Sequence, residues 1–192
     1  MYSPTILIFT IFCYNCRMIK HIVEVTNPTL RKNSKNVVKL DKKVLSLIKD
    51  LKDTLRAQTD PEGVGLAAPQ IGKNYRIFIM KPENVIKTVI NPEIISVENL
   101  SVKEGKKNNK IMEGCLSLPH YYGPLKRSAK VKVKYLTEEG KETVEEFTDF
   151  EAQIILHEVD HLNGILFVDR LLEQKKPLYE YVEGEWEEVD IL

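Results

Sequence analysis

Two histidines at helical spacing constrain this chain more than any other feature of its sequence. His157 and His161 lie four residues apart, inside a segment from Thr148 to Leu162 that has the patterning of a helix. Side chains four residues apart share one face of a helix, so both imidazoles can bind the same metal ion. Glu158 lies beside them, near enough to exchange a proton with water at that metal without being a ligand. The H-E-x-x-H pattern therefore predicts a metal-dependent hydrolase built around this helix.

The sequence also marks both ends of the helix. Thr148 can act as the N-cap, and Glu151 three residues later would complete a capping box. Asp149 adds a negative charge at the positive end of the helix dipole. Gly164 follows the last turn and predicts where the helix stops.

Other segments predict one further helix and several short strands. Asp41 can cap a helix whose apolar residues recur at helical spacing, namely Val44, Ile48, Leu51 and Leu55. Short apolar or alternating runs predict strands at 75–80, 85–90, 130–135 and 142–147, the last two joined as a hairpin. The predicted fold class is therefore α+β, with short, mostly antiparallel β-sheets packed around a central metal-binding helix and with an N-terminal helix.

Length and charge predict one globular domain. A chain of 192 residues can bury a substantial core, and no repeat, low-complexity tract or long linker divides it. Its 28 basic and 28 acidic residues cancel, so no global charge favours a nucleic-acid or membrane partner. Residues 178–192 carry six acids and no base, which makes that end a poor candidate for RNA docking. We predict a catalytic domain at 18–176, an acidic C-terminal tail at 177–192, no direct nucleic-acid binding and no membrane association.

Residues 1–17 are predicted to be an N-terminal extension of doubtful status. The apolar run Ile6–Phe12 is far shorter than the roughly 20 residues that span a bilayer. The segment also lacks the basic start and the small-residue cleavage site of a secretory signal. We interpret it as an upstream extension of the reading frame before Met18, with a weak membrane or partner contact as the alternative. Its cysteines, Cys13 and Cys16, lack the second pair that a four-thiolate zinc site needs.

Two histidines leave a catalytic metal site incomplete, because such sites keep three protein ligands and one open position. Cys115 is the best candidate for the third ligand, since a thiolate with two imidazoles suits Zn or Fe(II). It stands in a tight turn between Gly114 and Pro119. One alternative is an HExxH-type metallopeptidase with an acidic ligand after His161, for which the candidates are Asp169, Glu173 and Glu180. Another alternative is a structural metal module with a closed site.

Two further motifs accompany the histidine pair. The first is Gly63-Val64-Gly65-Leu66-Ala67-Ala68-Pro69-Gln70, and the second is Glu113-Gly114-Cys115-Leu116-Ser117. Together with His157-Glu158-Val159-Asp160-His161, they match the patterns G-x-G-x-A-A-x-Q, E-G-C-L-S and H-E-x-D-H in order and with comparable spacing. From about Met18 to about Leu172, the chain resembles the peptide deformylase family.

The resemblance implies an enzyme that removes the formyl group from the N-terminal formylmethionine of newly synthesised polypeptides. Cys115, His157 and His161 would hold one divalent metal ion, natively Fe(II), with Zn, Ni or Co able to replace it. Glu158 would take a proton from water and deliver it to the departing amine. The resemblance also implies a bacterial-type cytoplasmic enzyme whose nascent substrates bring it into transient proximity with the ribosome.

Further roles follow from the same resemblance. The side-chain amide of Gln70 and the backbone N–H of Leu116 fit by position as donors to the oxygen of the tetrahedral intermediate. The backbone of Gly65 can pair with an extended peptide. An apolar pocket for the methionine side chain is expected to be lined by Val64, Ile111, Phe150 and Ile154.

Three polar residues are expected to support the site. Arg127 matches an arginine that the family keeps after its cysteine motif. It is expected to form an ion pair with Glu62 or Glu113. Ser117 and Asp160 are expected to orient the cysteine turn and the metal-binding helix.

Overall fold

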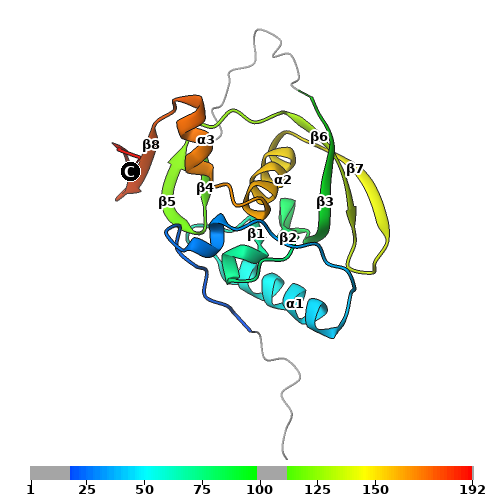
Figure 1. Cartoon of the computed structure of the whole chain (residues 1–192). Helices are drawn as coiled ribbons and strands as arrows, with labels where there is room; N and C mark the ends of the chain where they lie inside the picture. The colour runs from blue at the N-terminus through cyan, green and yellow to red at the C-terminus, as the bar shows by residue number, and fades with distance from the viewer. Residues whose placement is uncertain (1–17, 99–111, 192) are drawn as a thin grey trace, which may run out of the picture.

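Two antiparallel sheets lie on either side of helix α2 (Asp149–Leu162), which carries both histidines of the H-E-x-x-H motif (Figure 1). The computed structural model describes residues 18–98 and 112–191. The predictions made for residues 1–17 and for Ile111 lie outside these ranges. The predicted α+β class is confirmed, and every strand pairing among the described residues is antiparallel.

The first sheet has five strands in the order β1-β2-β3-β6-β7. Their bounds are Gly65–Ala67, Ile77–Met80, Lys87–Glu98, Lys130–Leu136 and Glu142–Thr148, respectively. The second sheet has four strands in the order β4-β5-β8-β9. Their bounds are Glu113–Cys115, Leu118–Gly123, Leu178–Val182 and Glu185–Val189.

The helical elements connect these strands and cover the sheets. Besides α2, the longer helices are α1 (Lys42–Ala57) and α3 (Phe167–Gln174). Short 3-10 helices lie at Pro28–Arg31, Ala68–Ile71 and Pro82–Asn84. None of the described helices is long and apolar enough to cross a membrane.

Strand β2 explains why α2 lies inside the molecule. All four of its residues are apolar and buried, as expected for a strand that is covered on both faces. Phe78 and Met80 pack against residues of α2, whereas Ile77 and Ile79 pack with α1 on the opposite face. Because α2 uses its apolar residues against the first sheet, its histidines are left to face the second sheet.

Strand β3 is longer than the predicted strand at 85–90. It continues through Asn91 and Pro92 to Glu98, with a shift of register between Ile90 and Glu93. Proline cannot donate to the ladder, and Asn91 adopts a positive φ of 51°, so the chain forms a bulge here and then resumes pairing. The bulge at Asn91 and Pro92 interrupts the apolar run on which the prediction was based, but the strand continues beyond it.

The predicted caps of the two long helices had different outcomes. Asp41 caps α1 as predicted, because its carboxylate accepts a hydrogen bond from Val44 N at 2.9 Å. The capping box predicted for α2 is wrong, since Thr148 makes no side-chain cap hydrogen bond with any described residue. Asp149 instead adopts a positive φ of 50°, and its N–H donates to the carbonyl of Ala129 at 2.7 Å. The entry to α2 is therefore held by a neighbouring loop.

The segment expected to be an acidic tail contains strands β8 and β9, which form a hairpin on the second sheet. Leu178 is buried and packs with Phe167 and Leu171 of α3. The acidic residues of the hairpin alternate with apolar and aromatic ones, for example Trp186 between Glu185 and Glu187. The prediction of a tail considered only the net charge of the segment and not this alternation. Helix α3 was also not predicted, because it is only eight residues long.

Candidate metal centre and adjoining cleft

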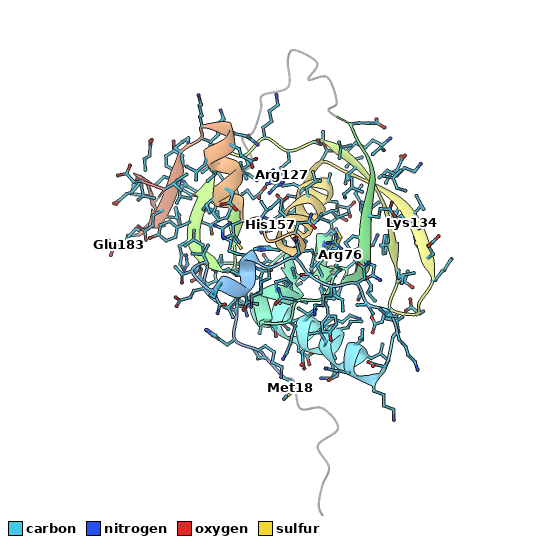
Figure 2. The ribbon with its side chains drawn as sticks, viewed as in Figure 1. Met18, Arg76, Arg127, Lys134, His157 and Glu183 are labelled. Atoms are coloured by element: carbon cyan, nitrogen blue, oxygen red, sulfur yellow. The ribbon has the colours of Figure 1, made fainter. Side chains whose placement is uncertain are left out.

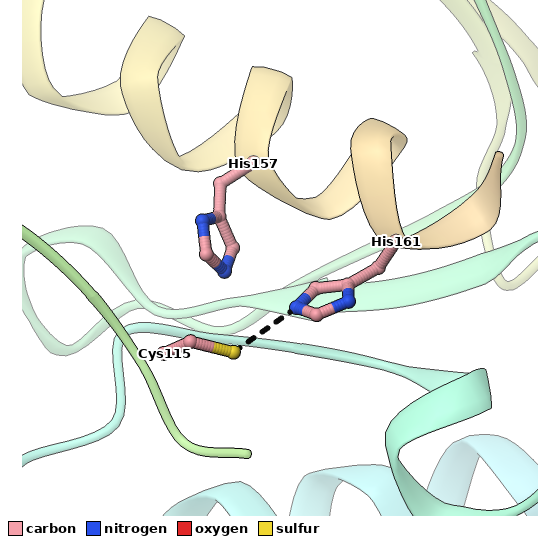
Figure 3. A group of neighbouring side chains, drawn as sticks. All are labelled: Cys115, His157 and His161. Carbon is pink, nitrogen blue, oxygen red and sulfur yellow. Dashed lines mark hydrogen bonds between the residues drawn. The ribbon is translucent and has the colours of Figure 1, made fainter. Parts of the chain in front are cut away.

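Cys115, His157 and His161 meet between α2 and β4 (Figure 3). Their potential ligand atoms all lie within 4.8 Å of one another, and Cys115 Sγ is 3.2 Å from His161 Nε2. All three side chains are buried. One thiolate and two imidazoles form a donor set that fits Zn or Fe(II), so these residues could hold one metal ion.

The orientation of His157 is set by Glu113, which comes from β4. His157 Nδ1 donates to Glu113 Oε1 at 2.7 Å, which leaves Nε2 free to face Cys115. Burial raises the pKa of Glu113, but hydrogen bonds from Arg127 and His157 outweigh burial and lower the pKa to about 2. Glu113 is therefore a buried carboxylate that fixes the tautomer of His157, as the hydrogen-bonded partners of metal ligands usually do.

The site favours a thiolate before any metal binds. Burial raises the pKa of Cys115, but the charge of His161 and hydrogen bonds from both histidines hold it well below its ordinary value. Burial lowers the pKa of His157, but its bonds to Cys115 and Glu113 outweigh burial and raise it well above the usual range. The thiolate is the form of cysteine that binds metals, so Cys115 is prepared for that role.

Glu158 is an unpaired acid at the edge of this group. It is buried, and its Oε2 atom has no hydrogen-bond partner among residues 18–98 and 112–191. Burial raises the pKa of this carboxyl to about 7, although the charges of His157 and His161 oppose the shift. Its other oxygen reaches β1, where a Cβ added at Gly65 would lie only 2.2 Å from Glu158 Oε1. Glycine at 65 therefore provides the space that Glu158 occupies.

Gln70 is held with its amide nitrogen directed at the cysteine turn. Its Oε1 accepts from Ala67 N at 2.8 Å, which fixes the orientation of the buried amide. Its Nε2 lies 3.3 Å from Ser117 Oγ and 3.5 Å from Cys115 Sγ. A donor is thus placed beside the candidate metal ligands.

A cavity of about 240 Å³ opens next to these groups. The residues predicted for the site that line it are Val64, Gly65, Gln70, Cys115, Leu116, Phe150, Ile154, His157 and Glu158. Ile154 is buried, whereas Phe150 is 44% exposed. Ile111 lies outside the described residues, so its predicted place in the pocket is untested.

Each sheet ends at this cavity with an edge strand. β1 is the first strand of its sheet, and β4 is the first strand of the other. In the described part of the chain, each has a neighbouring strand on one side only. Backbone groups on the open sides of β1 and β4 can pair with an extended peptide that lies in the cleft.

Of the two partners predicted for Arg127, Glu62 and Glu113, the structure shows an ion pair with Glu113. Arg127 contacts Glu113 through Nε at 2.8 Å and through Nη2 at 2.5 Å, as one of the two predictions stated. Glu62, the other predicted partner, is bound by Lys81 Nζ at 3.1 Å. Arg127, labelled beside α2 in Figure 2, also donates to Asp160 Oδ2 at 2.6 Å, and this bond ties the loop after β5 to α2.

Several residues of the site were missed in the sequence. Gln153 lines the cavity and donates to Glu113 Oε2 at 3.3 Å. It lies four residues before His157, so helical spacing could have identified it. Tyr121 and Tyr122 also line the cavity, and Arg170 binds Asp160 from α3. No local pattern marks these three residues, because they reach the site only through the arrangement of β5 and α3.

The acids proposed as alternative third ligands have other partners. Asp169 accepts from Leu166 N at 2.8 Å and is also bound by Arg31. Glu173 accepts from Arg170 at 2.9 Å, and Glu180 interacts with Tyr121 on the neighbouring strand. The geometry therefore favours Cys115 as the third ligand.

Comparison with known proteins assigns the family. Residues 19–177 match the family model described as polypeptide deformylase. The chain belongs to this family. The peptide deformylase of Pseudothermotoga lettingae is 42% identical over 160 residues, which cover 83% of this chain and 86% of the relative. Peptide deformylase 1 of Clostridium acetobutylicum is 41% identical, over 82% of this chain and 97% of the relative.

Solved structures of peptide deformylases share the fold. The crystal structure of the enzyme from Thermotoga maritima superposes with a TM-score of 0.70 at 37% identity, covering 79% of this chain and 97% of that chain. The enzyme from Synechococcus elongatus, solved in complex with actinonin, gives a TM-score of 0.71 at 29% identity, covering 88% and 87%. Membership of the deformylase family does not favour the alternative of an HExxH-type metallopeptidase.

Proposed function

We propose that this protein is a metal-dependent peptide deformylase that removes the formyl group from N-terminal formylmethionine of newly synthesised polypeptides. Cys115, His157 and His161 would hold one divalent ion, with Fe(II) favoured and Zn, Ni or Co as substitutes. The observation that carries the proposal is the buried carboxyl of Glu158, unpaired at Oε2 among the described residues, beside this three-ligand group. A closed structural metal site would have no use for such an acid.

The proposed chemistry divides between the metal and the chain. A bound divalent metal lowers the pKa of water toward neutrality and so supplies the nucleophile for the formyl carbon. Glu158 accepts the proton of that water and passes it to the amine that leaves. Gln70 Nε2 and the backbone N–H of Leu116 donate to the oxygen on which negative charge develops.

Substrate binding is proposed to follow the two edge strands. The peptide lies extended in the cleft and pairs with the backbone of Gly65 on β1. Val64, Phe150 and Ile154 line the cavity beside Glu158 and would surround the methionine side chain, with Ile111 as a further member. Because the substrates are nascent chains, we place the reaction in the cytoplasm with transient proximity to the ribosome.

The decisive experiment is anaerobic purification with metal analysis, joined to an assay that measures formate release from formyl-Met-Ala. The proposal expects one metal ion per chain and turnover of the formylated peptide. Cys115→Ser separates it from the peptidase alternative, since a deformylase with this ligand set loses metal and activity together. Full metal content and activity in Cys115→Ser would contradict the proposed ligand set.

A further inference from the structure

Helix α3 contacts the candidate metal centre at several points, although it contributes no ligand. The ring of Phe167 lies 6.4 Å from the ring of His157, centroid to centroid. Phe167 and Leu171 also pack in one apolar cluster with Cys115. The remaining contact is polar, and it is made by Arg170. The α3 residues that make these contacts are not among the described residues that line the cleft.

Arg170, which also pairs with Glu173, begins a continuous series of charged groups that leads to His157. Its Nη2 donates to Asp160 Oδ1 at 2.7 Å, and its Nε donates to Asp160 Oδ2 at 3.1 Å. Asp160 also accepts from Arg127 at 2.6 Å. Arg127 in turn donates to both oxygens of Glu113, which accepts a hydrogen bond from His157 Nδ1. Every link between α3 and the imidazole is therefore a charge-assisted hydrogen bond.

The balance of charge shows what Arg170 contributes. Glu113 and Asp160 are both buried carboxylates, and Arg127 lies between them. Buried carboxylates are costly unless each has a cationic partner. Among the described residues, Asp160 has Arg127 and Arg170 as its cationic partners. With Arg170 present, Arg127 can give two of its nitrogens to Glu113 and only one to Asp160.

We infer that Arg170 is a positioning residue for His157, the proposed metal ligand. It acts through the three groups between them, Asp160, Arg127 and Glu113. Without Arg170, Asp160 competes with Glu113 for the guanidinium of Arg127, and the hold of Glu113 on the imidazole loosens. The inference deepens the proposed function, because it rests on His157 being a ligand.

The test uses the full chain loaded with Co(II), whose visible absorption reports the geometry of its ligands. Arg170→Met keeps an unbranched apolar side chain in place of the arginine stem and removes the charge. Arg31→Met is the matched control, because Arg31 also pairs with an acid of α3, Asp169, but lies outside the series that ends at His157. Co(II) affinity is measured by competition with a chelator, and the apo proteins are compared by thermal unfolding.

We expect Arg170→Met to weaken Co(II) binding about ten-fold, the low end for loss of a partner that orients a ligand, and to shift the absorption bands. Arg31→Met should leave both affinity and bands unchanged. Arg170→Lys should fall between wild type and Arg170→Met, since lysine keeps the charge but lacks the two-point fork. Wild-type affinity and bands in Arg170→Met would overturn the inference. Equal losses in Arg170→Met and Arg31→Met would do so too, because docking of α3 would then explain both.

If Arg170→Met fails to fold, Arg170→Lys decides the question, and wild-type bands in that variant contradict the inference. Turnover of formyl-Met-Ala is measured on the same Co(II)-loaded wild type. Absence of turnover there counts against the proposed deformylase, whereas turnover combined with an unaffected Arg170→Met counts only against the positioning role. The two failures are therefore distinguishable.

Discussion

At the scale of single residues, the buried acids near the metal centre differ in how they are partnered. Glu113 accepts hydrogen bonds from Arg127, His157 and Gln153, and those from Arg127 and His157 lower its pKa to about 2. Among the described residues Glu158 has no such set of partners, and burial raises its pKa to about 7. An acid that is already satisfied suits the orientation of a ligand, whereas an unpaired acid suits proton transfer.

Glu158→Ala should retain metal but lose roughly 10²–10⁴-fold in kcat, the usual contribution of a general acid–base. The physical reason is that the other acids lining the cavity, among the described residues, are already paired: Glu62 with Lys81 and Glu113 with Arg127. Steady-state turnover of formyl-Met-Ala and metal content per chain provide the measurement. Near-normal turnover in a variant with full metal would end the proposed role of Glu158.

Gly65→Ala should displace the carboxylate of Glu158, the proposed general base, because the new Cβ would lie 2.2 Å from Glu158 Oε1. A misplacement of about 1 Å can cost roughly 10²-fold in rate, so we expect kcat to fall by at least that factor. Gly63→Ala is the control, since its Cβ would meet Leu55 at 2.8 Å in the core instead. It should lower Tm more and kcat less than Gly65→Ala does. The reverse order would contradict this account of Gly65.

At the scale of elements, the hairpin of β6 and β7 is attached to the sheet partly through Glu145. Glu145 accepts from Lys87 of β3 at 2.5 Å and from Tyr135 of β6 at 2.6 Å. Burial raises the pKa of Glu145, but these two hydrogen bonds outweigh it and lower the pKa below its ordinary value of 4.5. The carboxylate form therefore binds the edge strand β7 to its neighbours.

A lowered pKa in the folded state makes this contribution to stability dependent on pH. It is fully present above the unfolded pKa of about 4.5 and is lost as pH falls through the lower, folded pKa. Glu145→Gln should cost about 1 kcal/mol or less at pH 7, because the side chain is 37% exposed, and nothing below the folded pKa. Urea unfolding of wild type and Glu145→Gln, at pH 7 and at a pH below the folded pKa, measures this difference in the free energy of unfolding. Glu142→Gln, on the same strand but 61% exposed, should show a smaller difference at pH 7.

The C-terminal hairpin makes a separate prediction, because one of its residues belongs to the core. Leu178 is 5% exposed and packs with Phe167 and Leu171. Leu178→Ala should lower the free energy of unfolding by about 2–5 kcal/mol, the usual cost of such a cavity. Val182→Ala, at a site that is 40% exposed on the same strand, should change it by about 0.5 kcal/mol or less. Equal effects of the two changes in thermal unfolding would show that the hairpin does not contribute to the core.

At the scale of the whole molecule, the candidate metal centre lies between two sheets that share no strand. Cys115 belongs to the second sheet, whereas His157 and His161 lie on α2, which packs on the first. A metal bound by all three would connect the two halves of the fold. The folded state alone brings these ligands together, so metal binding and folding should be coupled.

Removal of the metal should therefore lower Tm. A ligand present at about 100 times its Kd stabilises the folded state by about 2.7 kcal/mol, and we expect an effect of that order. Thermal unfolding with added Zn and after chelation gives the measurement. Cys115→Ser, which removes one ligand from the second sheet, should show a much smaller difference between the two conditions. A wild-type Tm that is unaffected by chelation would contradict a metal that links the sheets.

The sequence by itself determined the features that depend on local periodicity, namely which side chains share one face of a helix and which short runs form buried strands. A repeat of 3.6 residues per turn puts His157 and His161 on one face of a helix wherever that helix lies. A short apolar run predicted β2 in the same way, because a strand covered on both faces needs no polar alternation. These features depend on residues close together in the chain, so no tertiary contact is needed to read them.

Only the tertiary structure decided whether the distant residue that the sequence favoured lies beside the two histidines. Cys115, which the sequence already favoured as the third ligand, lies 46 residues before His161, and the acids after His161 remained as alternatives. Packing resolved the choice, because α3 and the β8–β9 hairpin give those acids other partners while β4 places the thiolate against α2. The contribution of Arg170 has the same origin. It depends on where α3 packs, and short amphipathic elements take their position from the rest of the fold.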